Sequence, residues 1–289
     1  MDYGQLVKLI NDINSFIASN ILMWGLLGAG TYLSFLLGFP QITKIGYAFK
    51  MVFGGLFRKT ENSNEGSMSS FQALATAVAA QVGTGNVAGV ATAITAGGPG
   101  AVFWMWVSAF LGMGTIFTEA VLAQKYRKRI HGELVGGPAY YISRGLKKTG
   151  KFAKFLAGFF SVTIILALGF MGNAVQSNSI AAGIKGISGL ENINPGIIGI
   201  IVAILAALIF IGGMNKIAKF AELVVPIMAA VYILASILVL LIFHKEVIPT
   251  FTWIVKSAFS PNAVVGGIAG ASVKVAVQKG IARGLFSNE

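Results

Sequence analysis

The stretch AVAAQVGTGNVAGVATAITAGGPG, from Ala77 to Gly100, decides what kind of protein this chain is. It contains no charged residue and is long enough to cross a bilayer, which takes about 20 residues of helix. Its middle, however, is GTGN, residues 83–86, and a glycine costs about 1 kcal/mol relative to alanine inside a helix. Unwound backbone survives in hydrocarbon only where it is buried in protein or lines a polar cavity. The stretch therefore predicts a membrane helix that is broken at its middle.

The composition of the whole chain supports a membrane location. Of its 289 residues 55% are hydrophobic and 11% are charged, and the mean hydropathy is +0.77. The absence of cysteine excludes disulfides, thiol catalysis and thiolate metal sites. We find no phosphate-binding Walker motif, no nucleophile elbow and no catalytic pair of acids, so the sequence offers little support for an enzyme. In a chain this apolar, the net charge of +12 bears on membrane orientation rather than on nucleic acid.

Seven apolar segments predict seven membrane spans, preceded by an amphipathic lead-in. The predicted spans are 19–39, 71–96, 101–123, 153–183, 197–213, 223–243 and 264 to the C-terminal region. Because cytoplasmic loops are rich in Lys and Arg, the loops show which side is inside. The loops at 40–70, 124–154 and 214–222 hold fifteen basic residues, against four in the N-terminus and the other connections. We therefore expect the N-terminus outside and the broken helix running from inside to outside.

Two interpretations of the break are open from the residues alone. Glycines allow membrane helices to pack closely, and such packing needs no special site. Alternatively, the carbonyls that a break frees can bind a cation, and the amides that start the next half-helix can bind a carboxylate. The polar residues Gln81, Thr84 and Asn86 favour this second interpretation, because packing requires glycines but not amides.

The fourth predicted span carries a second group of polar side chains. Asn173, Gln176 and Ser177 are spaced i, i+3 and i+4, so they are expected to share one helix face. Such side chains can serve as hydrogen bonds between helices, each worth about 1 kcal/mol. The density of the group favours one wall of a polar pocket facing the broken helix, with Phe170 as an apolar floor.

Three further ionisable residues have simpler interpretations. Glu119 is expected to pair with nearby basic residues rather than to carry protons. Glu222 and Pro226 are expected to start or kink the sixth span, after a basic cytoplasmic turn at 214–222. His244 is expected to be interfacial. Because there is no second histidine at ligand spacing, we predict no metal-enzyme site.

Five ordered motifs carry a family resemblance. They are GTGN at 83–86, GGPGAVFWMW at 97–106, EAVLAQKYR at 119–127, GGPAYYI at 136–142 and GIARGLFSNE at 280–289. From about residue 20 to the last residue the chain resembles the alanine or glycine:cation symporters, also called sodium:alanine symporters. The resemblance implies an all-α polytopic membrane protein with an inverted-repeat, LeuT-like amino-acid transporter fold. It further implies alanine or glycine as substrate, sodium as coupling ion, no cofactor, no nucleic-acid partner, and a place in the lipid bilayer of the plasma (inner) membrane.

The resemblance also implies which residues bind. The unwound first core helix of the family falls on the GTGN stretch, and the polar patch of its third core helix falls on Asn173, Gln176 and Asn178. Four small residues near the start of the second repeat, Gly266, Gly267, Gly270 and Ser272, would also line the site. The expected substrate-binding residues are Gln81, Gly83, Thr84, Gly85, Asn86, Phe170, Asn173, Gln176 and Gly270, with Thr84 and Asn86 as the expected sodium ligands.

The expected organisation has three parts. Residues 1–70 form a lead-in, a peripheral first span and a cytoplasmic linker, and residues 71–243 form the first five-helix repeat. Residues 244–289 form an outer loop and the start of a second repeat, which is truncated at Glu289. Lys274 and Lys279 depart from the small or apolar residues that the family usually has there. Two alternatives to a sodium-coupled symporter stay open: a truncated product that transports nothing or needs a separate C-terminal half, and a membrane scaffold whose glycines serve packing alone.

Overall fold

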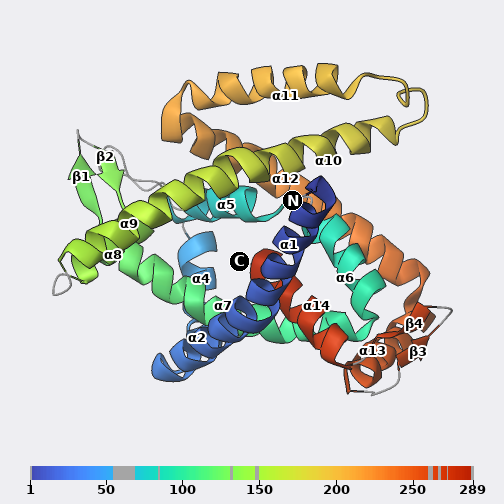
Figure 1. Ribbon diagram of the computed structural model, residues 1–289. Helices are drawn as coiled ribbons and strands as arrows, with labels where there is room; N and C mark the ends of the chain where they lie inside the picture. Colours follow the sequence, from blue (N-terminus) through green and yellow to red (C-terminus); the bar gives the residue numbers. More distant parts are fainter. Residues whose placement is uncertain are drawn as a thin grey trace. The chain divides into compact units, whose positions relative to one another are not determined.

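The computed structural model describes residues 2–54, 69–83, 85–130, 133–146, 150–259, 263–265, 268–271 and 273–287 (Figure 1). The helical elements before the first strand are α1 (Tyr3–Phe16), η1 (Ile17–Leu22), α2 (Met23–Leu36), α3 (Pro40–Thr43), α4 (Ile45–Phe53), α5 (Ser70–Gln81), η2 (Gly85–Gly89), α6 (Val90–Gly97) and α7 (Gly100–Lys125). Those after it are α8 (Pro138–Gly145), α9 (Lys151–Ile164), η4 (Ile165–Gly172), α10 (Asn173–Lys185), α11 (Pro195–Phe210), α12 (Gly213–Ile242), α13 (His244–Phe259) and α14 (Val273–Ser287). The η elements are π-helical turns.

Two short antiparallel hairpins are the strands that the described residues contain. In the first, β1 (Lys128–Ile130) pairs with β2 (Glu133–Val135), and Arg129 lies opposite Leu134. In the second, β3 (Ala263–Val265) pairs with β4 (Ile268–Ala271). The predicted all-α architecture therefore holds for the spans, while the hairpins are additions that the sequence interpretation missed.

Internal contacts divide the chain into two compact units. Unit 1 comprises Met1–Gly46, Gly85–Thr118 and Ala229–Glu289, and unit 2 comprises Tyr47–Thr84 and Glu119–Met228. The division falls inside the GTGN stretch. The first half of the broken helix, α5, therefore belongs to unit 2, and the second half, η2 with α6, belongs to unit 1.

Helices long enough to cross a membrane dominate both units. Within the described ranges four helical runs are long and apolar enough: Gly4–Leu36, Gly100–Lys125, Lys151–Lys185 and Lys216–Ile242. The bent pair Ser70–Gln81 and Asn86–Gly97 adds a fifth if it counts as one span, and α11 is a shorter apolar helix of 16 residues. These segments correspond to the first six predicted spans.

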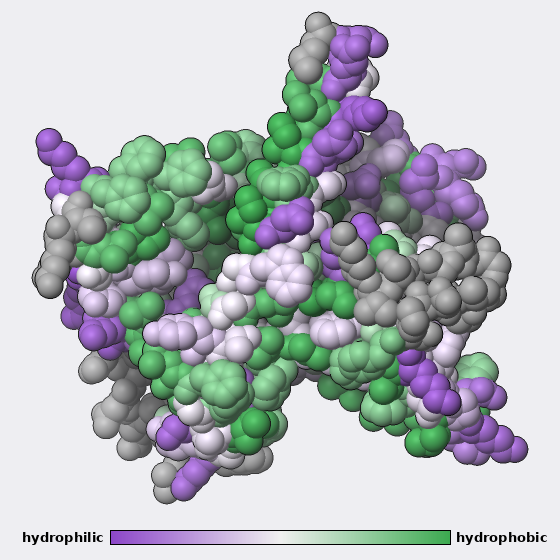
Figure 2. Space-filling view, turned by 60° about the horizontal axis from the view of Figure 1, so that its bottom comes forward, coloured by the Kyte–Doolittle hydropathy of each residue, from purple (hydrophilic) through white to green (hydrophobic). Residues whose placement is uncertain are grey.

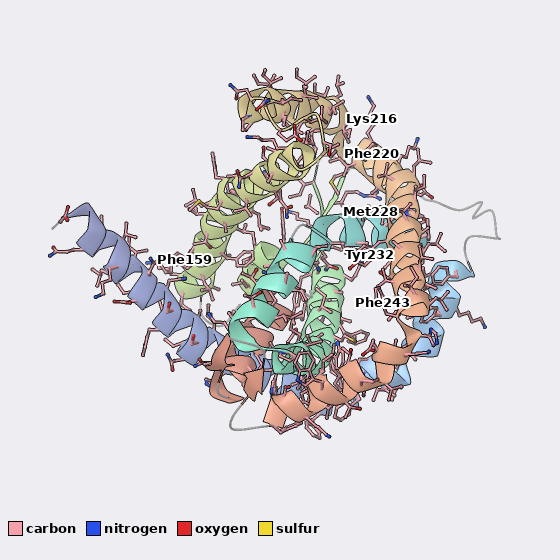
Figure 3. All side chains as sticks on the ribbon, turned by 90° about the vertical axis from the view of Figure 1, so that its right-hand side faces the viewer. Phe159, Lys216, Phe220, Met228, Tyr232 and Phe243 are labelled. Atoms are coloured by element: carbon pink, nitrogen blue, oxygen red, sulfur yellow. The ribbon has the colours of Figure 1, made fainter. Side chains whose placement is uncertain are left out.

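Large apolar side chains lie on the outside of these helices. Much of the surface in Figure 2 is hydrophobic. Figure 3 labels Phe220, Met228 and Tyr232 along α12, Phe243 just after it, and Phe159 on α9. All five are at least 41% exposed. Such exposure suits contact with lipid, because hydrocarbon solvates these side chains as well as a protein core does.

Unit 1 is assembled through small residues that let helix backbones approach closely. A Cβ on Gly30 of α2 would lie 2.8 Å from the carbonyl oxygen of Leu111 in α7, and a Cβ on Gly114 would lie 2.6 Å from Ser34 Oγ. In the same unit the indole of Trp104 donates a hydrogen bond of 3.2 Å to the carbonyl of Ala258 in α13. Small residues at these positions are the usual means of close helix packing in membranes.

Unit 2 contains a small apolar cluster between α5 and α12. Ala75 of α5 packs with Ala221 and Val225 of α12, and Val78 covers the cluster. In the same unit α9, η4 and α10 form one continuous helical run, Lys151–Lys185, and α10 packs against α11. The cluster is the point at which the first half of the broken helix gains apolar support.

Three boundaries differ from the sequence prediction. The first span is continuous with its lead-in. A capping box between Asp2 and Gln5 starts α1, and the helical run then continues to Leu36. The expected basic turn at 214–222 is helical, since α12 begins at Gly213, where a φ of +67° makes the turn. The expected outer loop at 244–263 contains the amphipathic helix α13. An acid in its first turn and a base in its last complement the helix dipole.

The start of the seventh predicted span is wrong. We expected a helix from residue 264, but β3 and β4 occupy 263–265 and 268–271, and α14 begins at Val273. Valine and isoleucine are β-branched and favour extended backbone, and the glycines around them weaken a helix further. The apolar composition of this segment concealed its low helix propensity.

Candidate functional site

The broken helix is interrupted at Val82 and Gly83. Helix α5 ends at Gln81, Val82 has an extended backbone with a ψ of 99°, and Gly83 forms a bend. Thr84, an expected ligand of both substrate and sodium, lies outside the described residues. The helix resumes with the π-helical turn η2, so Gly85 and Asn86 belong to the second half rather than to the unwound segment.

The two helix ends next to the break have dipole charges of opposite sign. The last turn of a helix presents carbonyl oxygens and a partial negative charge, and the first turn presents amides and a partial positive charge. A cation suits the end of α5, and a carboxylate suits the start of η2.

Gln176 lies against the end of α5 inside unit 2. A Cβ placed on Gly83 would be 2.5 Å from the Nε2 atom of Gln176 and 3.4 Å from its Oε1. A side chain at position 83 would therefore displace the amide. The structure brings these two predicted site residues, Gly83 and Gln176, into direct contact, with a flexible amide at the point where the helix is open.

The other polar residues of the fourth span do not gather at this point. Asn173 Nδ2 donates a hydrogen bond of 3.0 Å to the carbonyl of Gly169 in its own helix, and Ser177 faces Gly199 of α11. All three residues lie in the regular helix α10, so their i, i+3 and i+4 spacing on one face is kept. The described contacts nevertheless differ, with Gln176 at Gly83 and Ser177 at Gly199.

Two more expected site residues of this span are exposed to the surroundings. Phe170, the expected apolar floor, is 66% exposed on η4, and Asn178 is exposed on α10. Gln81, at the last position of α5, is half-buried. In unit 2 the described contacts therefore assemble Gln176 with Gly83 and leave the remaining members apart.

The expected residues of the second repeat are only partly described. Gly266, Gly267 and Ser272 lie outside the described residues, and Gly270 lies in strand β4 instead of a helix. Asn86, in unit 1, is half-buried in η2. No ligand role for these residues follows from their positions alone.

A polar contact that the sequence interpretation missed holds the start of α5. Ser69 caps the helix by accepting a hydrogen bond from the backbone of Gln72, whose side chain reaches back to Ser69. The Nε2 atom of Gln72 also donates a hydrogen bond of 2.8 Å to the carboxylate of Glu222 in α12. Glu222 was expected to start a helix, yet it lies inside α12 and tethers α5. An acid among apolar residues was the available signal, but its partner lies 150 positions away.

A second missed residue is Arg283 of α14, in unit 1. A Cβ placed on Gly89 at the end of η2 would collide with the guanidinium of Arg283. The second half of the broken helix thus carries an arginine directly against its backbone. The motif GIARG at 280–284 was used only as part of the family resemblance. Nothing in the motif indicated which helix the arginine contacts.

Near the other end of α7, Glu119 acts on a tyrosine. Burial, and secondarily the charge of Glu119, raise the pKa of Tyr141 in α8 above its ordinary value. Glu119 was expected to pair with nearby basic residues. Over the part of the chain that the structure describes, its electrostatic neighbour is this phenol.

These features define a class of protein: a polytopic α-helical membrane protein with an apolar helix interrupted after Gln81. Over residues 3–289 the chain matches the sodium:alanine symporter family, and it belongs to that family. The family is one of transporters and not of enzymes.

Three relatives illustrate the range of the match. The sodium/alanine symporter AgcS of Methanococcus maripaludis is 43% identical over 99% of this chain and 61% of its own length. The amino-acid carrier protein AlsT of Bacillus subtilis is 38% identical over 98% of this chain and 57% of its own length. A Bacillus subtilis protein named "Probable sodium/glutamine symporter GlnT" is 36% identical over 98% of this chain and 56% of its own length. The chain thus spans 56–61% of the length of these relatives.

Proposed function

We propose that this protein carries out sodium-coupled symport of small neutral amino acids, alanine or glycine, by alternating access across the plasma membrane. The observation that carries the proposal is the break after Gln81, where helix ends of opposite polarity meet the chain's GTGN stretch. The carboxylate of the substrate would bind amides at the start of η2, and sodium would bind near the end of α5 through Thr84 and Asn86. The names of the relatives, which include a sodium/alanine symporter, support the same coupling.

The substrate is proposed to be small because of the side chain that lies next to the break. Gln176 occupies the space beside Gly83, and its amide would close the pocket over a short side chain. Gly85 and Asn86 complete the proposed site, and Gln81, Phe170, Asn173 and Gly270 are proposed as its outer members. One relative is named as a sodium/glutamine symporter, so glutamine is the competitor that most sharply tests the preference for small substrates.

The proposed topology places the N-terminus outside and the broken helix from inside to outside. Residues 71–243 would form the first repeat of an inverted-repeat, LeuT-like fold, and the second repeat would begin after 243. Support comes from the basic residues that gather in alternate loops. Because the chain has no cysteine, single introduced cysteines can report sidedness directly. A cysteine at exposed Lys50 is expected to react only with reagents that enter the cell.

The central experiment measures uptake of labelled alanine by the protein expressed from its full reading frame in a transport-deficient host. Uptake is expected to require sodium, and excess glycine is expected to compete more strongly than excess glutamine. Uptake that ignores sodium would contradict the coupling. Equal competition by glutamine would contradict the size preference and leave sodium-coupled amino-acid transport standing.

Asn86→Ala tests the site within that assay. Loss of the amide is expected to reduce uptake at least about tenfold, because a lost hydrogen bond to a charged group costs about 1.5–3 kcal/mol. Membrane abundance should stay unchanged, since the residue is half-buried and its replacement is a good helix former. Ala88→Ser, two residues along the same turn, is the matched control for a polar change nearby. Normal uptake by Asn86→Ala would contradict a binding role for GTGN and favour the alternative, in which its glycines serve helix packing.

A further inference from the structure

Arg283 brings a charge to the packing of α14 against the second half of the broken helix, in unit 1. Helix α14 lies beside α6 (Figure 1). A Cβ on Gly97 would be 3.5 Å from the Cα of Ala276 and 3.0 Å from the Cβ of Lys279, while Gly89 faces the guanidinium of Arg283. Because the order of contacts reverses along the two helices, they run antiparallel. Arg283 therefore reaches the beginning of the second half of the broken helix.

The position of Arg283 is fixed by its neighbours on α14. A Cβ on Gly280 would collide with the carbonyl oxygen of Ala101 in α7, and one on Gly284 would collide with Ser108 Oγ. These glycines, three residues before Arg283 and one after it, hold the backbone of α14 against α7. The arginine side chain extends from a helix that cannot shift without moving another backbone.

Packing alone does not account for an arginine at this place. Arg283 is half-buried, and burying a charged group costs free energy that an aliphatic side chain in the same space would avoid. A guanidinium differs from an aliphatic group in being planar, always charged and equipped with five N–H donors. Those properties suit contact with polar backbone near a helix start.

Gly89 is the matching feature on the other helix. All three guanidinium atoms nearest to the position of a Gly89 Cβ, Cζ and the two terminal nitrogens, would be in collision with it. Gly89 closes the π-helical turn that begins at Gly85. Asn86 lies three residues earlier, which is about one helical turn, so any displacement of Gly89 also displaces Asn86.

We propose that Arg283 is a positioning residue for transport: its guanidinium lies on the backbone of Gly89 and sets the position of the turn that carries Asn86. This proposal rests on the amino-acid symport proposed above. The pair Gly89 and Arg283 acts as one element, in which the glycine leaves room for the charge and the charge fixes the turn. Because Asn86 is a proposed substrate ligand, a loosened turn is expected to weaken substrate binding measurably.

The kinetic test compares Gly89→Ala, Arg283→Ala and Arg283→Lys in sodium-driven alanine uptake. The two alanine variants are each expected to raise the KM for alanine about tenfold while the maximal rate per transporter falls less than threefold. Arg283→Lys keeps the charge and most of the length, and should recover part of the loss. Gly112→Ala in α7 is the control, because a Cβ there meets nothing within 4 Å.

The double variant separates this role from simple packing. If the guanidinium is the group that the Gly89 Cβ would displace, Gly89→Ala adds no further loss once Arg283 is already alanine. If the effects of the two single variants on the KM multiply in the double variant, the proposal is overturned. It is also overturned if the KM of both single variants stays within twofold of the parent. If Arg283→Ala reaches the membrane poorly, Gly89→Ala and Arg283→Lys still decide, since an unchanged KM in both also overturns it.

A second measurement does not depend on transport. Val87 is 60% exposed in η2, and the chain has no other cysteine to interfere, so Val87→Cys can be labelled with a thiol reagent. Adding Arg283→Ala is expected to change the labelling rate more than about threefold, whereas adding Gly112→Ala should not. An unchanged rate would overturn the positioning role. A parent protein that labels as expected but takes up no amino acid would instead refute the proposed function.

Discussion

The two halves of the broken helix are held by different kinds of contact. The first half, α5, buries Ala75 in a small cluster and is tethered by the hydrogen bond between Gln72 and Glu222. The second half, α6, buries Ala93 and Gly97, and Gly97 packs closely against Lys279 and Ala276 of α14. The first half is held by a side-chain hydrogen bond and a small apolar cluster, and the second by close packing of a glycine face against another helix.

This difference bears on which half can move. A side-chain hydrogen bond can break and re-form while the helices keep their shape, and its net contribution is small. Closely packed helices lose many van der Waals contacts when they separate even slightly. If the protein works by alternating access, α5 is therefore the half expected to move, and α6 the half expected to stay with α14. Substitutions in and around each half test that contrast.

The largest expected effect comes from filling a backbone contact of unit 1. In Gly280→Ala the new Cβ collides with the carbonyl oxygen of Ala101, and only movement of a helix can relieve the collision. Overpacking of this kind costs about 1–3 kcal/mol, so the thermal unfolding midpoint in detergent should fall clearly. Gly112→Ala is the control, and it should leave the midpoint unchanged or slightly raised. A Gly280→Ala protein as stable as the control would break the comparison.

A smaller effect is expected from removing the side-chain hydrogen bond that holds α5, the first half of the broken helix. Glu222→Ala removes the acceptor of the 2.8 Å hydrogen bond from Gln72, and because both side chains are partly exposed the loss should be about 1 kcal/mol. Thiol labelling of an exposed cysteine at Ala79 in α5 should become faster, whereas labelling at Val87 in η2 should not change. Glu222→Gln keeps an acceptor and is the matched control. Equal changes at both reporters would mean that the halves move together.

A still smaller effect is expected at the open end of α5. In Gly83→Ala the new Cβ meets the end of the Gln176 side chain, which can rotate to another rotamer. The loss of stability should stay below about 1 kcal/mol, well under that of Gly280→Ala. Adding Gln176→Ala should remove even this loss. A large penalty would show that the first half is as tightly fitted as the second.

The smallest effect is expected from removing the charge of Glu119 near Tyr141, in unit 2 and away from the break. Glu119→Gln should lower the pKa of Tyr141 toward its ordinary value without restoring it, because burial is the larger cause of the increase. The folded protein favours the neutral phenol, so this contribution to stability is present at neutral pH and is lost as pH rises through the raised pKa. Ultraviolet titration of the phenolate, with Tyr141→Phe to assign the signal, measures the change. No shift in Glu119→Gln would remove Glu119 as a cause.

Sequence patterns located most of the helices but not their contacts. Long apolar runs such as 101–123 and 153–183 predicted α7 and the run of α9, η4 and α10 to within a few residues, because hydrocarbon demands about 20 apolar residues of any span. The same criterion failed at 263–265 and 268–271, where apolar residues form two paired strands. Hydropathy measures compatibility with lipid and does not measure helix propensity.

The expected site shows the same limit at the level of single residues. Spacing placed Asn173, Gln176 and Ser177 on one face of α10, yet Gln176 contacts Gly83 and Ser177 contacts Gly199 of α11, because neighbouring helices meet different parts of that face. The tether of Gln72 by Glu222 and the contact of Arg283 with Gly89 join residues far apart in the chain, so no local pattern could indicate them.

The sequence by itself determined that this protein crosses a membrane several times, that one of its helices is interrupted near GTGN, and that its motifs are those of the sodium:alanine symporter family. These properties follow from composition, local backbone preference and ordered motifs, all of which are written along the chain. Only the tertiary structure decided that a tethering amide holds one half of the break and an arginine lies against the other. The reason is physical: such contacts depend on how distant helices approach, and that is set by glycine fit and helix register rather than by any neighbouring residue.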